Sequence, residues 1–179
     1  KPVILAGSCS AATRGQVETA IAAGVLARKI DPLAIADGSL TAEGLVDWVV
    51  AHTTNRPALV YSSDEPQSVK AVQDRLGREA AGTLVEHLLA EVGVKLRDAG
   101  YSRFVIAGGE TSGAVVEALG VRSLRIGPEI APGVPWTRSI GAPDLALALK
   151  SGNFGAPDFF LQAWALLDAC CRHTYAEPC

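Results

Sequence analysis

The chain has 179 residues, 49% of them hydrophobic and 20% charged, and a formal net charge of −3. This profile is typical of a soluble globular protein and excludes a disordered chain. The small negative charge and the scattered Lys and Arg residues argue against nucleic-acid or anionic-membrane partners. No stretch approaches the roughly 20 apolar residues that a membrane span needs, and no signal peptide is visible, so we expect a cytoplasmic protein.

The start of the chain favours a domain excised from a longer protein. The sequence begins Lys1-Pro2-Val3 and contains no methionine, whereas a complete translation product normally supplies its initiator. A length of 179 residues suits one α/β domain with a sizeable core. We therefore expect a single domain over residues 1–179.

The first half of the chain alternates apolar segments with helical patterns. The predicted elements are a strand, a helix, a strand, a helix and a strand, over residues 3–6, 13–29, 32–36, 41–51 and 57–61. Thr41 is the expected N-cap of the second helix. The polar turn that follows the third strand contains Asp64 and Glu65, which we interpret as turn residues rather than as a paired acid site.

The second half begins with the longest helical pattern and ends in shorter segments. It contains a helix, a strand and a helix, three short extended segments and a last helix, over residues 77–99, 104–107, 114–119, 123–126, 134–139, 145–149 and 157–171. The alternation predicts an α/β fold: a three-layer α/β/α domain with a mostly parallel mixed sheet and an antiparallel extension late in the chain.

Three polar glycine loops follow predicted strands directly, at residues 7–10, 108–113 and 151–155. If these strands are parallel, all three loops lie at one edge of the sheet, where open α/β sheets bind ligands. Glycine lets backbone N–H groups approach phosphate oxygens. The candidate nucleotide ligands are Ser8, Ser10, Gly108, Gly109, Glu110, Thr111, Ser112, Gly113, Lys150, Gly152 and Asn153.

Alternatives remain open at several of these positions. Thr111 or Ser112 could cap the helix, so part of the second loop would arise with no ligand. Glu110 could bind Mg²⁺, usually through water, could accept a ribose hydroxyl, or could simply be favoured by a helix N-terminus. Lys150 could place a positive charge near a phosphate. Trp136 could stack on adenine, but a packed loop anchor is the more common role for such a residue.

The loops, together with residues 126–136, resemble the four-carbon acid sugar kinase family, and specifically its C-terminal nucleotide-binding domain. The segments that carry the resemblance are Leu5-Ala6-Gly7-Ser8-Cys9-Ser10, Ala107-Gly108-Gly109-Glu110-Thr111-Ser112-Gly113, Ile126-Gly127-Pro128-Glu129-Ile130-Ala131-Pro132-Gly133-Val134-Pro135-Trp136 and Leu149-Lys150-Ser151-Gly152-Asn153-Phe154-Gly155. They span almost the whole chain.

The resemblance implies a kinase that uses ATP and Mg²⁺ to phosphorylate a four-carbon sugar acid of the threonate, erythronate or 3-oxo-tetronate type. It matches Ser8 or Ser10, residues 108–111 and Gly152 to nucleotide contacts. It also implies that a missing N-terminal domain supplies much of the acid-sugar site. The chain alone is therefore expected to bind ATP or ADP but to transfer phosphate poorly, and no catalytic base can be assigned on it.

Two other functions are compatible with the same loops. The chain could be a non-catalytic regulatory module that binds a nucleotide or an acidic metabolite. It could also be an unrelated glycine-loop transferase, such as a methyltransferase. The apolar helix faces leave the oligomeric state open, because the missing domain or a second copy of the chain could cover them.

Overall fold

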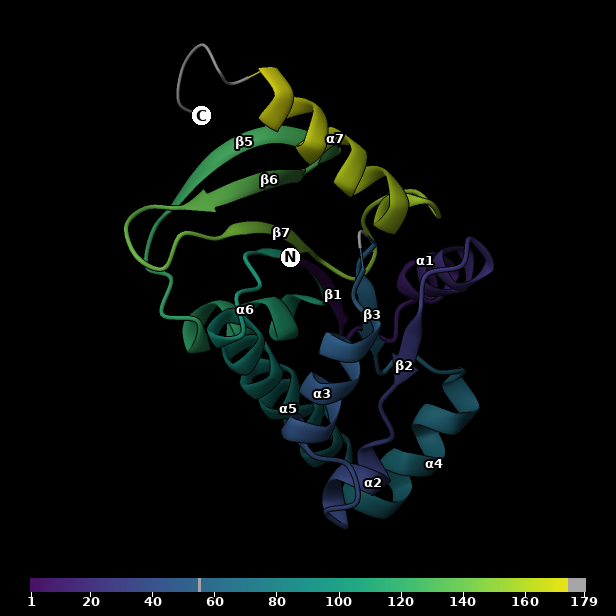
Figure 1. Cartoon of the computed structure of the whole chain (residues 1–179). Helices are drawn as coiled ribbons and strands as arrows, with labels where there is room; N and C mark the ends of the chain where they lie inside the picture. Colours follow the sequence, from purple (N-terminus) through teal and green to yellow (C-terminus); the bar gives the residue numbers. More distant parts are fainter. Residues whose placement is uncertain (55, 174–179) are drawn as a thin grey trace.

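A computed structural model describes residues 1–54 and 56–173, which form one seven-stranded sheet flanked by helices (Figure 1). The strand order is β2-β3-β1-β4-β7-β6-β5. The strands are β1 (Pro2–Ala6), β2 (Ala27–Lys29), β3 (Ala58–Tyr61), β4 (Arg103–Ala107), β5 (Leu124–Ala131), β6 (Val134–Ser139) and β7 (Ala146–Lys150). The first four strands and β7 are parallel, whereas β6 is antiparallel to both β5 and β7. The prediction of a mostly parallel mixed sheet with a late antiparallel extension is confirmed.

Helices cover both faces of this sheet. The helices are α1 (Ala11–Ala22), α2 (Pro32–Ala36), α3 (Ala42–His52), α4 (Pro66–Leu76), α5 (Arg78–Asp98), α6 (Gly109–Ala118) and α7 (Phe159–His173). Strand β1 shows the layering, because Val3 and Leu5 pack in one apolar cluster with α3, α5 and α6. Ile4 and Ala6 pack in the other cluster with α1 and α7. The domain therefore has the three layers that the sequence predicted.

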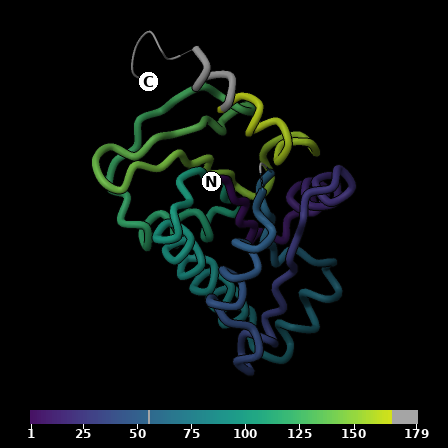
Figure 2. The backbone as a smooth tube through the Cα atoms, viewed as in Figure 1, coloured from purple at the N-terminus to yellow at the C-terminus, as the bar shows by residue number. Residues whose placement is uncertain are grey.

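The central strands are buried on both faces. Every residue of β1 is buried, and four of the five residues of β4 are buried as well. Such continuous apolar runs are typical of parallel strands covered by helices on each side. Helices α2 and α4 lie beyond the carboxyl end of β2, away from the antiparallel strands, as the backbone trace also shows (Figure 2). No helix of the described residues is both long and apolar enough to span a membrane.

The structure corrects two predictions in the first third of the chain. The strand expected over residues 32–36 is instead helix α2, because the Asp31 carboxylate accepts a hydrogen bond from Leu33 N (2.9 Å) and Pro32 opens the helix. The helix expected over residues 13–29 ends at Ala22. Gly24 then adopts a positive φ of 84°, and the chain continues as β2.

Two further elements differ from the sequence-based prediction. Helix α4 lies where only a turn and the approach to the next helix were expected. Helix α6 begins at Gly109, about one turn before the predicted start at Ala114. Its N-cap residue is Gly108, so neither Thr111 nor Ser112 caps it, and the capping alternative for these two side chains is wrong.

Candidate functional site

Strands β1 and β4 lie side by side in the middle of the sheet, and the helices that follow them leave toward opposite faces. Residues 2–6 pair in parallel with residues 103–107. Helix α1 then packs on one face of the sheet, and α6 packs on the other. The two chain segments diverge at the carboxyl ends of the strands, and such a switch point is where open α/β sheets form their ligand crevice.

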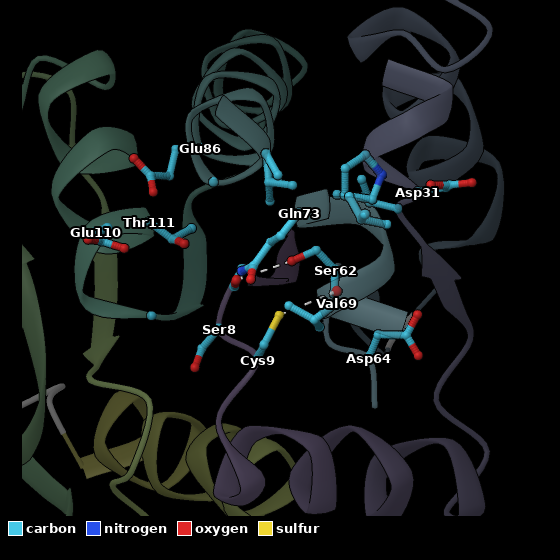
Figure 3. A pocket seen from close by; sticks show the side chains of 18 of the residues that line it. Ser8, Cys9, Asp31, Ser62, Asp64, Val69, Gln73, Glu86, Glu110 and Thr111 are labelled. Atoms are coloured by element: carbon cyan, nitrogen blue, oxygen red, sulfur yellow. Dashed lines mark hydrogen bonds between the residues drawn. The ribbon is translucent and has the colours of Figure 1, made fainter. Parts of the chain in front are cut away.

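A cavity of about 690 Å³ opens at this point (Figure 3). Its lining comes from residues 7–10 after β1, from the last residue of β2 and the segment after it (29–33), and from residues 108–111 after β4, together with the segment after β3 and parts of α4 and α5. In Figure 3, Glu110 and Thr111 lie on one side of the cavity, while Asp31 and Asp64 lie on the other. The volume is within the range of small-molecule and cofactor sites.

Hydrogen bonds hold the three glycine loops against one another. The N–H of Gly7 donates to the Ala107 carbonyl (2.9 Å), and the N–H of Gly108 donates to the Lys150 carbonyl (2.7 Å). The Ser10 hydroxyl donates to the Gly152 carbonyl (2.6 Å). Since β1, β4 and β7 are parallel, the expectation that these loops share one sheet edge is confirmed.

The predicted ligand residues divide into two groups at this edge. Six of them line the cavity: Ser8, Ser10, Gly108, Gly109, Glu110 and Thr111. The remaining five are outside its lining: Ser112, Gly113, Lys150, Gly152 and Asn153. Gly152 is nevertheless a close neighbour of the first loop, because an ideal Cβ at this position would lie 2.5 Å from Ser8 Oγ.

Thr111 explains why two of the cavity residues are glycines. An ideal Cβ at Gly7 would overlap the Thr111 hydroxyl oxygen, and one at Gly108 would lie 2.9 Å from that oxygen. Gly108 also has a φ of 125°, which other residues rarely adopt. The first and second loops can therefore approach each other only without side chains at these positions.

The start of helix α6 faces the cavity without a side-chain cap. Gly108 is the N-cap residue and offers no side-chain acceptor to the first backbone N–H groups. A helix leaves its first N–H groups without partners in the helix, and its dipole favours negative charge there. By contrast, the N-terminus of α1 is capped, because the Ser10 hydroxyl accepts a hydrogen bond from Thr13 N (3.2 Å). The uncapped α6 start is thus the better anion acceptor of the two.

Lys150 is fully buried next to this edge, outside the cavity. Its ammonium donates to the Thr13 hydroxyl (3.1 Å) and to the carbonyls of Ser151 (3.1 Å) and Gly152 (2.9 Å). Burial lowers the pKa of Lys150 to about 8. These hydrogen bonds link the loop at residues 151–155 to Thr13 of α1.

Two other polar residues line the cavity at the ends of β1 and β3. Cys9 is exposed, but partial desolvation of its thiol is the largest cause that raises the pKa of this group above its ordinary value. Asp64 pairs with Lys29 (2.7 Å) and accepts a hydrogen bond from Glu65 N (2.8 Å). Partial burial works to raise the pKa of Asp64, but the bonds from Lys29 and Glu65 outweigh it and hold that pKa below its ordinary value. Asp64 thus bonds to Glu65 N within its turn and forms an ion pair with Lys29 of β2.

Trp136 lies away from the cavity, in the core between β6 and α7. Only 2% of its surface is exposed, and its indole N–H donates to the Ala163 carbonyl (2.8 Å). The Trp164 ring lies 5.5 Å from it, centroid to centroid. The interpretation of Trp136 as a packed anchor is confirmed.

Within residues 1–54 and 56–173, no group of three or more His, Cys, Asp and Glu side chains could hold a metal ion by itself. Mg²⁺ commonly uses one or two carboxylates together with phosphate oxygens and water. Glu110, exposed in the first turn of α6 and lining the cavity, fits that smaller role.

The cavity, its glycine loops and the uncapped helix start are the features of a nucleotide-binding domain. Consistent with this geometry, residues 3–160 match the family model described as a nucleotide-binding C-terminal domain. The chain belongs to the four-carbon acid sugar kinase family.

Two relatives of this kinase family are identical to the chain at more than half of the aligned positions. The chain is 56% identical over 161 residues to a 3-oxo-tetronate kinase of Cupriavidus necator and 53% identical over 161 residues to one of Pseudomonas fluorescens. Each alignment covers 90% of this chain but only 37% of the relative. The chain thus spans little more than a third of the length of these relatives.

Solved structures show the same fold. A Haemophilus influenzae protein of family DUF1537 superposes with a TM-score of 0.88 at 38% identity, over 93% of this chain and 40% of that protein. A DUF1537 domain from Bordetella bronchiseptica, described as a citrate-bound, domain-swapped dimer, has a TM-score of 0.74 at 22% identity, over 90% of this chain and 40% of that one. The latter likeness concerns the fold alone.

Proposed function

We propose that this chain is the ATP-binding domain of a kinase that phosphorylates a four-carbon sugar acid. The observation that carries the proposal is the cavity at the β1–β4 switch point, where two glycine loops and the uncapped start of α6 meet. Phosphate groups suit this corner, because backbone N–H groups can approach them without interference from side chains. The name of these relatives supports a kinase, with 3-oxo-tetronate as the first candidate acceptor. Threonate and erythronate are the further candidates that the family resemblance implies.

Three groups of this chain are proposed to hold the triphosphate. The N–H groups of residues 109–111 would donate to phosphate oxygens, and the hydroxyls of Ser8 and Thr111 would add two further donors. Such fixed donors stabilise the charge of a transferring phosphoryl group without reorganising during the reaction. Lys150 would act on the phosphates only through the loop that it fastens.

Glu110 is the residue proposed to hold Mg²⁺, directly or through water. A carboxylate beside bare phosphate is repulsive, and a cation between the two removes this repulsion. When bound, Mg²⁺ supplies positive charge against the phosphate oxygens. The same carboxylate also stabilises the N-terminal end of α6, since the helix dipole favours negative charge there.

In the complete kinase, a hydroxyl of the sugar acid would attack the γ-phosphoryl group of ATP. We propose that a further N-terminal domain, in the part of the relatives that this chain does not span, supplies the acid-sugar site and the group that orients the hydroxyl. The two domains would then catalyse largely by positioning the reactants. The chain alone is expected to bind ATP or ADP and to transfer phosphate poorly, and the complete kinase is proposed to act in the cytoplasm.

Nucleotide binding to the chain tests the proposal. A ligand at 100 times its dissociation constant raises the free energy of unfolding by about 2.7 kcal/mol, so MgATP is expected to stabilise the chain against urea. An absence of stabilisation at millimolar MgATP would contradict the proposal. Turnover of 3-oxo-tetronate by a full-length kinase that carries this domain separates a kinase from a regulatory module.

Two glycines of α6 provide a matched pair of variants. A Cβ at Gly109 or at Gly113 would meet no protein atom within 4 Å, but only Gly109 lines the cavity. Gly109→Ala is expected to weaken ATP binding by roughly ten-fold, because its methyl group keeps a phosphate from one charge-assisted hydrogen bond. Gly113→Ala is expected to leave ATP binding unchanged. Equal effects of both variants would contradict the proposed phosphate position.

A further inference from the structure

The cavity also has an apolar region, which elements other than the glycine loops line. Ile30 and Leu33 line it from the end of β2 and from α2, Val69 and Val72 from α4, and Ala81 and Val85 from α5. Neither phosphate nor a sugar acid gains from such a surface, because their oxygens need polar partners. A flat apolar group does gain, by about 25 cal/mol for each Å² of apolar surface that leaves water.

Helix α4 forms one wall of this region and is itself poorly packed. None of its residues is buried, and it ends at Gly77, which has a φ of 86°. Val69 and Val72, three positions apart on one face of the helix, point their half-buried side chains at the cavity. A ligand between α4 and α5 would cover this face, which the protein itself leaves partly exposed.

Gln73 brings hydrogen-bonding groups from α4 to the space between the apolar region and the loop after β1. Its side chain extends from α4 into the cavity (Figure 3). No residue in the described ranges is a hydrogen-bond partner of its carboxamide, which carries both donors and an acceptor. By contrast, the nearby Asp31 carboxylate caps α2 and the Asp64 carboxylate pairs with Lys29. The carboxamide is therefore available to a ligand, as are the Arg78 and Glu86 side chains of α5, which also line the cavity.

We propose that the region between α4 and α5 is a purine-base subsite, in which Val72 packs on the ring and Gln73 hydrogen-bonds its edge. This inference rests on the proposed function, since it places the base of the nucleotide whose phosphates bind at residues 108–111. A carboxamide can pair with adenine by accepting from the exocyclic amino group while donating to a ring nitrogen. The apolar walls would bind the faces of the ring, and the carboxamide would provide the specificity for its edge.

A matched pair of variants on α4 tests the packing part of this subsite. Val72→Asn places an uncharged polar group against the ring, whereas Ala71→Asn adds the same side chain at an exposed neighbour that does not line the cavity. The change to asparagine lowers helix propensity at least as much at Ala71 as at Val72. Ala71→Asn therefore controls for any general destabilisation of α4. We expect Val72→Asn to weaken MgATP binding roughly five-fold and Ala71→Asn to leave it unchanged.

Inorganic tripolyphosphate, with Mg²⁺, separates the subsite from the phosphate site. It carries the phosphates without the base, so its affinity is expected to be equal in the unchanged chain and in both variants. Retained tripolyphosphate binding also shows that Val72→Asn is folded. Equal MgATP affinities of Val72→Asn and the unchanged chain would overturn the base subsite alone. Failure of the unchanged chain to bind either MgATP or tripolyphosphate would overturn the proposed function as well.

Gln73→Met tests the hydrogen bond to the base edge, because methionine is similar in size but has no comparable donor or acceptor. We expect this variant to lose roughly five- to ten-fold in affinity for ATP. It should lose clearly less for purine riboside triphosphate, which lacks the exocyclic amino group. Titration calorimetry of the two nucleotides with both chains measures the difference. An equal loss for the two nucleotides, or no loss for ATP, would overturn the role of Gln73.

Discussion

The hydroxyl oxygen of Thr111 lies in the space that a side chain at Gly7 would occupy. This contact joins the loop after β1 to the first turn of α6, and both residues line the cavity. Gly7→Ala forces the two segments apart, and overpacking of this kind costs about 1–3 kcal/mol of unfolding free energy. Urea unfolding of the variant is expected to show this loss.

A double-mutant cycle assigns the loss to the contact itself. Thr111→Ala removes the hydroxyl oxygen, so Gly7→Ala should cost at least 0.5 kcal/mol less in the presence of this second substitution, an order-of-magnitude estimate for residues in contact. Strictly additive effects would contradict the steric explanation.

Lys150 should make stability depend on pH in the alkaline range. Its pKa is lowered from 10.5 to about 8 in the folded chain. Between these values the folded state releases a proton that the unfolded state keeps, so the free energy of unfolding rises with pH. The full rise is about 3 kcal/mol, because each unit of pKa difference between the two states contributes 1.36 kcal/mol. Below pH 8 both states keep the proton, so the cost of burying the ammonium is fully present.

Comparison with Lys150→Met isolates this contribution. Urea unfolding of both chains at intervals from pH 7 to 10 gives the two profiles, and their difference removes the titration of other groups. We expect the unchanged chain to gain stability over this range relative to Lys150→Met. Parallel profiles would show that the ammonium is not buried in the folded state.

Glu110 should couple nucleotide binding to Mg²⁺. Glu110→Gln is expected to lower MgATP affinity about five-fold, since a carboxylate and a cation attract by on the order of 1 kcal/mol in a water-like medium. Without Mg²⁺ the same variant should bind ATP at least as well as the unchanged chain, because a repulsive charge has gone. Calorimetry with Mg²⁺ and with a chelator measures both, and Glu117→Gln, on the same helix but outside the cavity, is the control. A loss of affinity that is equal with and without Mg²⁺ would contradict the metal role.

Trp136 should matter for stability but not for nucleotide binding. Trp136→Phe removes the indole N–H that donates to Ala163 O and leaves a buried carbonyl without this partner. We expect a loss of about 1–3 kcal/mol of unfolding free energy. ATP affinity should stay within two-fold at temperatures where the variant is folded. A selective loss of ATP affinity would instead support stacking of the adenine base on Trp136.

The sequence predicted most of the sheet because its central strands are continuous apolar runs that helices cover on both faces. It failed at α2, where the run over residues 32–36 is too short for its period to separate a strand from a helix. The Asp31-Pro32 pair was the signal for a helix start. In the same way, Glu65-Pro66 opens α4, and the spacing of Val69, Val72 and Leu76 marks its apolar face.

The phosphate side of the site was also predictable, because glycine loops after parallel strands meet at one edge. The opposite wall of the cavity could not be predicted from the sequence. Its residues lie after β2 and on α4 and α5. They come together only because α4 forms, and this helix was not predicted. The burial of Lys150 could not be predicted either, because the loop that covers its ammonium has a polar sequence.

The position of β1 in the strand order bears on how the chain acquires its binding site during synthesis. Both neighbours of β1 in the sheet, β3 and β4, are made after it. The carbonyl of Ala107 that fixes Gly7 belongs to β4, and the carbonyl of Lys150 that fixes Gly108 belongs to β7. A ribosome-bound chain that ends before residue 150 therefore lacks a contact of the phosphate corner, so the ability to bind nucleotide should appear late in translation.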